Sequence, residues 1–150
     1  MKNIRVSLFA LALAAMGSVQ ANQPEATATV TGQWTTMDDE TGQPKSVVEI
    51  YQENGKLYGK VVEIFDPAKK AALCTECKGA DKDQPVLGLV IIKGLSKDGD
   101  DYSDGDILDP KNGKLYSCTL SLANADQLNV RGYLGFSLLG RSQTWQRVNR

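Results

Sequence analysis

The sequence predicts an all-β fold, a closed antiparallel up-and-down barrel of about eight strands. Strand-like segments recur about every ten residues, and turn-forming residues separate them. After the N-terminal apolar run, no long segment has apolar residues at helical spacing. An open sandwich of two sheets would give the same spacing and is the main structural alternative. The predicted strands are residues 31–37, 46–53, 56–65, 86–95, 101–108, 114–122, 127–133 and 142–148.

The first 21 residues have the features of a secretory signal peptide. Lys2 and Arg5 precede an apolar run over residues 6–16, and small residues at Val19 and Ala21 form a cleavage pattern before Asn22. The run is too short to span a bilayer, and no later run is long enough to be a membrane span. We therefore expect a signal peptide at residues 1–21, one barrel domain at residues 22–150, and a periplasmic or secreted protein.

The charge of the mature chain argues against nucleic acid as a partner. Two of the 17 basic residues lie in the signal peptide, which leaves 15 against 18 acidic residues and a net charge of −3. The sequence also has no basic run, and phosphate backbones demand clustered lysine and arginine.

The residue patterns of individual strands and turns also agree with a barrel of antiparallel strands. Asn54-Gly55 and Asn112-Gly113 suit tight hairpins, where positive φ angles are needed. The segment 86–95 is almost continuously apolar and is expected to be covered on both sides. The strand 114–122 alternates clearly, so one set of its side chains should point into the barrel. That set is Tyr116, Cys118, Leu120 and Leu122.

The two ends of the strand series suggest how the base of the barrel is sealed. Gly32 and Trp34 lie on the first strand, and Trp145 and Arg147 lie on one face of the last. A guanidinium laid over an indole in the neighbouring strand would close the base by cation–π attraction. The simpler interpretation makes both tryptophans core anchors and Arg147 a surface charge.

The residues 130–141, which read VRGYLGFSLLGR, and the Gly-x-Trp start together resemble a known bacterial family. Residues 46–51, 55–61 and 104–110 add to the likeness, which covers essentially the whole mature chain. The chain resembles the exported, lipocalin-like proteins grouped as domain of unknown function 2147. The resemblance implies a lipocalin-like barrel, export and an interior cavity, and it implies no established reaction or ligand. Where many relatives are expected to carry an Asn-Pro and arginine-rich loop, this chain has Cys74-Thr75-Glu76-Cys77-Lys78.

The three cysteines allow four arrangements. Cys74 and Cys77 could form a local disulfide, with Cys118 buried as a small apolar residue. Cys118 could instead bridge to one of the loop cysteines. A zinc site of three thiolates with Glu76 or Asp81 is a third arrangement, and thiol redox chemistry is the fourth.

The absence of histidine from the 150 residues removes the commonest catalytic arrangements, so we predict no catalytic residues and no enzyme activity. The first functional hypothesis is a barrel without a cofactor that binds a small apolar or amphipathic molecule in its interior. Its lining is predicted to include Ile50, Leu89, Tyr116 and Leu120. A thiol-based metal or redox protein and an envelope interaction protein without a ligand are the alternatives.

Overall fold

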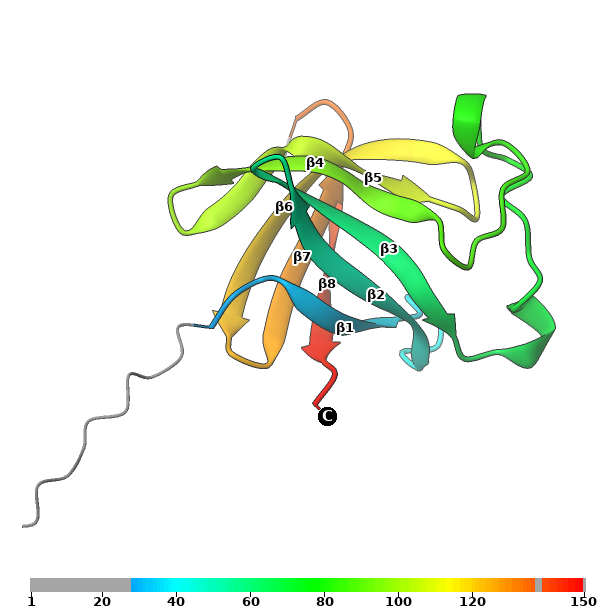
Figure 1. The fold of residues 1–150 in the computed structure, drawn as a ribbon, viewed down its shortest axis with the longest axis horizontal. Helices are drawn as coiled ribbons and strands as arrows, with labels where there is room; N and C mark the ends of the chain where they lie inside the picture. The colour runs from blue at the N-terminus through cyan, green and yellow to red at the C-terminus, as the bar shows by residue number, and fades with distance from the viewer. Residues whose placement is uncertain (1–27, 137–138, 150) are drawn as a thin grey trace, which may run out of the picture.

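The computed structural model describes residues 28–136 and 139–149, which form one closed barrel of eight strands (Figure 1). Each strand pairs antiparallel with its neighbours in the sequence, and β1 pairs with β8 to close the sheet. This confirms the predicted all-β, closed up-and-down architecture. The predicted signal peptide at residues 1–21 lies outside the described residues. The strands are β1 (Gly32–Met37), β2 (Pro44–Glu53), β3 (Lys56–Ile64), β4 (Val90–Asp98), β5 (Asp101–Asp109), β6 (Lys114–Asn124), β7 (Gln127–Tyr133) and β8 (Gly140–Arg147).

The up-and-down order gives the barrel two different ends. The β2–β3, β4–β5 and β6–β7 turns lie at one end, together with the start of β1 and the end of β8, and we call this end the base. The β1–β2, β3–β4, β5–β6 and β7–β8 connections lie at the other end, which we call the mouth end. Among the described residues, no helix is long and apolar enough to cross a membrane.

Turn chemistry explains the short connections. Asn54 and Gly55 both have positive φ angles, 49° and 77°, as a two-residue hairpin requires. At the β5–β6 turn only Gly113 has a positive φ, 69°, so the expectation for Asn112 was wrong. Asn112 instead accepts a hydrogen bond from the backbone N–H of Lys114 through its side chain at 2.9 Å.

The alternating pattern of β6 places its inward residues in the core, as the sequence suggested. Cys118 and Leu120 are fully buried. The interior is filled largely by apolar side chains from all around the barrel, and the largest of those fully buried in the core are Trp34, Ile50, Leu57, Ile92, Leu95, Leu120 and Leu128.

The sequence placed the start of the fourth strand too early. Residues 86–89 belong to the long β3–β4 connection, and β4 begins at Val90. Gly88 donates a backbone hydrogen bond to Val61 at 2.7 Å, and Val61 donates one to Leu89 at 3.0 Å, so the segment is held against β3 without joining the ladder. The segment was expected to be covered on both faces, and this is true within β4, where the neighbouring residues Ile91 and Ile92 are both buried.

The β3–β4 connection contains two short 3-10 helices, η1 (Pro67–Lys69) and η2 (Gly79–Asp81). Asp66 begins η1 by accepting a hydrogen bond from Ala68 N–H at 3.0 Å. In Figure 1 the connection lies beside the β5–β6 turn.

Candidate functional site: the mouth end of the barrel

The base of the barrel is held by Arg147. Its guanidinium carbon lies 4.1 Å from the centre of the Trp34 ring. The same guanidinium donates hydrogen bonds to the carbonyl oxygens of Thr31 at 3.2 Å and Thr29 at 2.6 Å. Gly32 has a φ of 126°, and a Cβ there would stand 2.9 Å from the Arg147 Nη1 atom. The first and last strands are thus fastened together at the base.

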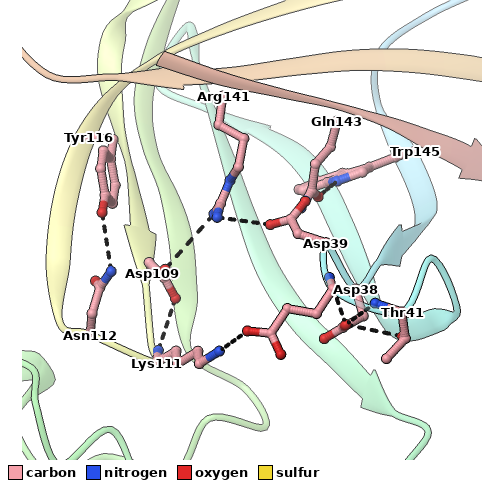
Figure 2. A network of polar contacts seen from close by, with 11 residues as sticks. Asp38, Asp39, Thr41, Asp109, Lys111, Asn112, Tyr116, Arg141, Gln143 and Trp145 are labelled. Atoms are coloured by element: carbon pink, nitrogen blue, oxygen red, sulfur yellow. Dashed lines mark hydrogen bonds and ion pairs between the residues drawn. The ribbon is translucent and has the colours of Figure 1, made fainter. Parts of the chain in front are cut away.

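The mouth is crossed by a polar network centred on Arg141 (Figure 2). Arg141 Nη1 lies 2.9 Å from an oxygen of Asp39 in the β1–β2 connection, and Nη2 lies 4.0 Å from an oxygen of Asp109 at the end of β5. Because β1 and β5 are four strands apart in an eight-stranded barrel, Arg141 joins opposite walls. The network continues inward, since Gln143 donates to Asp39 and Trp145 Nε1 donates to the Gln143 amide oxygen at 2.8 Å.

A second ion pair crosses the mouth beside the first. Lys111 Nζ lies 2.7 Å from a carboxylate oxygen of Glu40. This hydrogen bond to Glu40 is the main reason that the pKa of Lys111 is raised. Because both side chains are largely exposed, the pair is expected to fix the position of the β5–β6 hairpin more than it stabilises the fold.

The long connection packs on the outside of the barrel near the mouth, not across the opening. Leu108 and Leu115 are directly paired on β5 and β6, and this pair alternates with the inward pair of Ile107 and Tyr116. Leu108 therefore points outward, yet it is only 3% exposed. The segment 74–77 lies over this hairpin, because a Cβ on Gly113 would stand 1.9 Å from the backbone oxygen of residue 76.

Two further contacts hold the connection in place. Cys74 Sγ lies 3.7 Å from the Pro110 carbonyl oxygen. Asp81 in η2 forms an ion pair and hydrogen bond with Lys93 of β4. Cys74 and Cys77 are both buried and are joined as a disulfide. The loop thus adds a small apolar layer outside the barrel wall.

A groove of about 480 Å³ lies between this loop, the β5–β6 hairpin and the start of the β7–β8 connection. We call it the outer groove. Its apolar side chains are Leu108, Leu115 and Leu134, the last two of which are each 49% exposed. The remaining lining is polar or small and consists of Glu76, Lys78, Asp81, Asn112, Gly113 and Lys114.

Comparison with known proteins identifies the family. Residues 32–147 match the family described as "Uncharacterized protein conserved in bacteria (DUF2147)". The chain belongs to the DUF2147 family. A solved structure with a similar fold is protein HP1028 from Helicobacter pylori, described as belonging to the lipocalin family. It is 21% identical, has a TM-score of 0.73, and the match covers 82% of this chain and 85% of that one. No curated protein matches the chain.

Of the four residues predicted to line a ligand chamber in this DUF2147 protein, Ile50, Leu89 and Leu120 lie in one buried apolar core, and Tyr116 is not part of it. Ile50 and Leu120 are packed in the core with 1% and 0% exposure. Tyr116 lies at the mouth, where its hydroxyl oxygen is 3.1 Å from the amide nitrogen of Asn112. Leu89 lies in the long connection and lines a smaller hollow of about 300 Å³ beside η2.

The cysteines take the first of the predicted arrangements. The Cys74–Cys77 disulfide is confirmed, and Cys118 is a buried free thiol. The alternative hypothesis of a zinc site needs thiolates from Cys74, Cys77 and Cys118. Cys74 and Cys77 cannot supply them here, because their sulfur atoms are bonded to each other. Within residues 28–136 and 139–149, no cluster of three or more acidic or cysteine side chains could hold a metal ion. The thiol-based metal hypothesis therefore has no support in the described part of the DUF2147 barrel.

Burial of Cys118 predicts a specific loss of stability at high pH. Desolvation, with a smaller contribution from Asp106, raises the pKa of this thiol to about 12 from the ordinary 9.0. Above pH 9 the unfolded chain loses this proton while the folded chain keeps it, so stability falls as pH rises from 9 towards 12. From pH 8 to pH 10 we expect about 1.4 kcal/mol of loss from this group. Urea unfolding of the wild type and Cys118→Ala checks this, and an equal pH dependence in both would contradict it.

Sequence reasoning did not single out the leucines of the outer groove or the contacts of Arg141 at the mouth. Leu115 and Leu108 occupy outward positions of strands whose other outward side chains are mostly polar, and this mismatch was a usable signal. Leu134 and Arg141 both lie in the stretch that carries the family resemblance. Asp39 had no comparable signal, because acidic residues in turns are commonplace.

Proposed function

We propose that this DUF2147 protein is an exported binding protein that holds one small amphipathic molecule at the mouth end of its barrel, in the outer groove. The supporting observation is the distribution of exposed apolar side chains. Among the described residues, seven leucine and phenylalanine side chains are exposed, and all of them lie in or next to connections at the mouth end. They are Phe65, Leu73, Leu87, Leu115, Leu134, Phe136 and Leu139.

The groove is favoured over the interior for steric reasons. A molecule inside the barrel would have to displace core side chains such as Ile50 and Leu120, which are fully buried. A molecule in the outer groove would cover Leu115 and Leu134, which are already half-exposed, and would rest on Leu108. This costs no core packing.

The size of the groove limits the ligand and its affinity. A volume of about 480 Å³ lies within the range of small-molecule sites. Covering about eight methylene groups at about 0.8 kcal/mol each would contribute about 6 kcal/mol. Immobilisation costs offset part of this, so we expect dissociation constants in the micromolar range or weaker.

Export is part of the proposal. The disulfide between Cys74 and Cys77 is typical of oxidising compartments, and it agrees with the signal peptide expected at residues 1–21. The mass of protein recovered from the periplasm of an expressing bacterium tests this point. We expect a chain that begins at Asn22, whereas an uncleaved chain retained in the cytoplasm would contradict export.

Calorimetric titration with decanol tests binding, and the chain provides a matched control. Leu134→Ser should weaken decanol binding at least about fivefold, because it removes apolar contact area worth about 1 kcal/mol or more. Leu73→Ser should leave binding unchanged, since Leu73 has almost the same exposure, 48%, but does not line the groove. Equal effects of the two variants, or no decanol binding by the wild type, would overturn the proposal.

An envelope interaction protein is the second candidate, and one observation favours it. Phe136 and Leu139 are 81% and 70% exposed, more than any leucine of the groove, and neither lines the groove. If these side chains serve a protein partner, Phe136→Ser with Leu139→Ser should abolish partner capture without changing decanol affinity. Loss of decanol affinity in this variant would assign both side chains to the ligand site instead.

A further inference from the structure

The charged side chains of the outer groove are unevenly paired. Asp81 is neutralised by its contact with Lys93. Lys78 and Lys114 are exposed, and across residues 28–136 and 139–149 neither ammonium group forms an ion pair. Glu76 is the remaining charged residue of the lining and likewise has no ion-pair partner there. The groove lining therefore includes two exposed lysines and one glutamate that have no ion-pair partner among the described residues.

These ammonium groups lie on two different segments that enclose the same apolar surface. Lys78 immediately precedes η2 in the long connection, and Lys114 begins β6 directly before Leu115. The loop is held against the hairpin at Gly113, so the two segments are fixed relative to each other. A molecule lying on Leu108, Leu115 and Leu134 would thus lie between two segments that each carry a lysine of the groove lining.

We propose that the outer groove selects amphiphiles with an anionic head group, such as a carboxylate or a phosphate ester on a single apolar chain. This inference rests on the proposed function, because it concerns the ligand of the same groove. Lys78 and Lys114 would contact the head group, and the three leucines would contact the chain. Glu76 opposes the same head group and reduces the preference.

The expected selectivity is moderate because the groove is open to solvent. Exposed charge pairs contribute little in water, so an anionic head should be preferred over a neutral one by about three- to tenfold at low salt. The preference should shrink as ionic strength rises and the Debye length falls to about 8 Å at 0.15 M. A cationic head group should bind more weakly than the neutral one.

The test compares four decyl amphiphiles below their micellar concentrations by calorimetry at low salt. The probes are decanoate, decyl phosphate, decanol and decyltrimethylammonium. We expect both anions to bind more tightly than decanol, and the cation to bind more weakly than decanol. Comparison of the two anions identifies the preferred head group, whichever of them binds more tightly.

Two variants of the assigned residues should change decanoate affinity in opposite directions, and a third serves as a control. The double variant Lys78→Gln with Lys114→Gln should reduce decanoate affinity to that of decanol or below it, because Glu76 remains, while leaving decanol affinity unchanged. Glu76→Gln should strengthen decanoate binding about two- to threefold. Lys97→Gln is the matched control, because Lys97 is an exposed lysine near the base without an ion pair among the described residues, and it should have no effect.

The outcomes separate this inference from the proposed function. Equal binding of anionic, neutral and cationic probes, or an unchanged decanoate preference in the double variant, would overturn the head-group inference while leaving amphiphile binding intact. Failure of all four probes to bind would overturn both proposals.

Discussion

Replacing Trp34 with alanine is expected to lower the free energy of unfolding by about 3–5 kcal/mol, the range typical of large-to-alanine changes in cores. Trp34 has 0% exposure and is among the largest fully buried side chains. Its indole N–H donates to the Val30 carbonyl oxygen at 2.8 Å, and its ring supports the Arg147 guanidinium. The substitution removes packing, a buried hydrogen bond and the cation–π contact together. Urea unfolding measures the loss.

Arg147→Met separates these contributions. The change keeps an apolar chain over the indole but removes the charge, and a partly exposed cation–π pair contributes about 0.5–1 kcal/mol. Loss of the hydrogen bonds to Thr29 and Thr31 adds to this, so we expect a smaller total than for Trp34→Ala. A loss below about 1 kcal/mol for Trp34→Ala would mean that the base is not the packed closure described here.

Replacing Gly113 with alanine is expected to cost about 2–4 kcal/mol and to release the long connection from the hairpin. Gly113 has a φ of 69°, which an L side chain rarely adopts, and its added Cβ would stand 1.9 Å from the backbone oxygen of Glu76. Backbone cannot move aside as a flexible side chain can, so the segment 74–77 must separate from the β5–β6 turn. Faster tryptic cleavage after Lys78 and Lys82, together with urea unfolding, measures the release.

Gly99→Ala is the matched control for this prediction. Gly99 lies at the β4–β5 turn with a φ of 61°, and an added Cβ there would meet nothing within 4 Å. Gly99→Ala should therefore lower the free energy of unfolding only by the cost of placing an L side chain at a positive φ angle, about 1–2 kcal/mol. If both variants lose the same stability and keep the same tryptic resistance, the loop does not pack on the hairpin as described.

The barrel was predictable because its signals are local. Alternation in the strand 114–122, the Asn54-Gly55 turn and the tryptophans near both ends each report on a few neighbouring residues. The start of β4 was misplaced because residues 86–89 are as apolar as the strand that follows them. Their burial comes from the long connection and not from the ladder, and apolar composition does not distinguish the two.

The candidate site was less predictable because it depends on contacts between distant segments. Arg141 meets Asp39 and Asp109 only once the barrel has closed. The outer groove exists because the long connection folds back over β5 and β6, and nothing in the spacing of its residues says which wall it will cover. The resemblance to relatives predicted the barrel and the family. The shape of the groove depends instead on the cysteine-bearing loop of this chain.

Methyl NMR during titration with decanoate tests the location of the ligand most directly. We predict that the methyl signals of Leu108, Leu115 and Leu134 shift with increasing decanoate, while those of Ile50 and Leu120 in the core stay in place. Shifts concentrated at Ile50 and Leu120 would place the ligand inside the barrel and contradict a site on its outer wall. An unchanged spectrum at saturating decanoate would contradict binding itself.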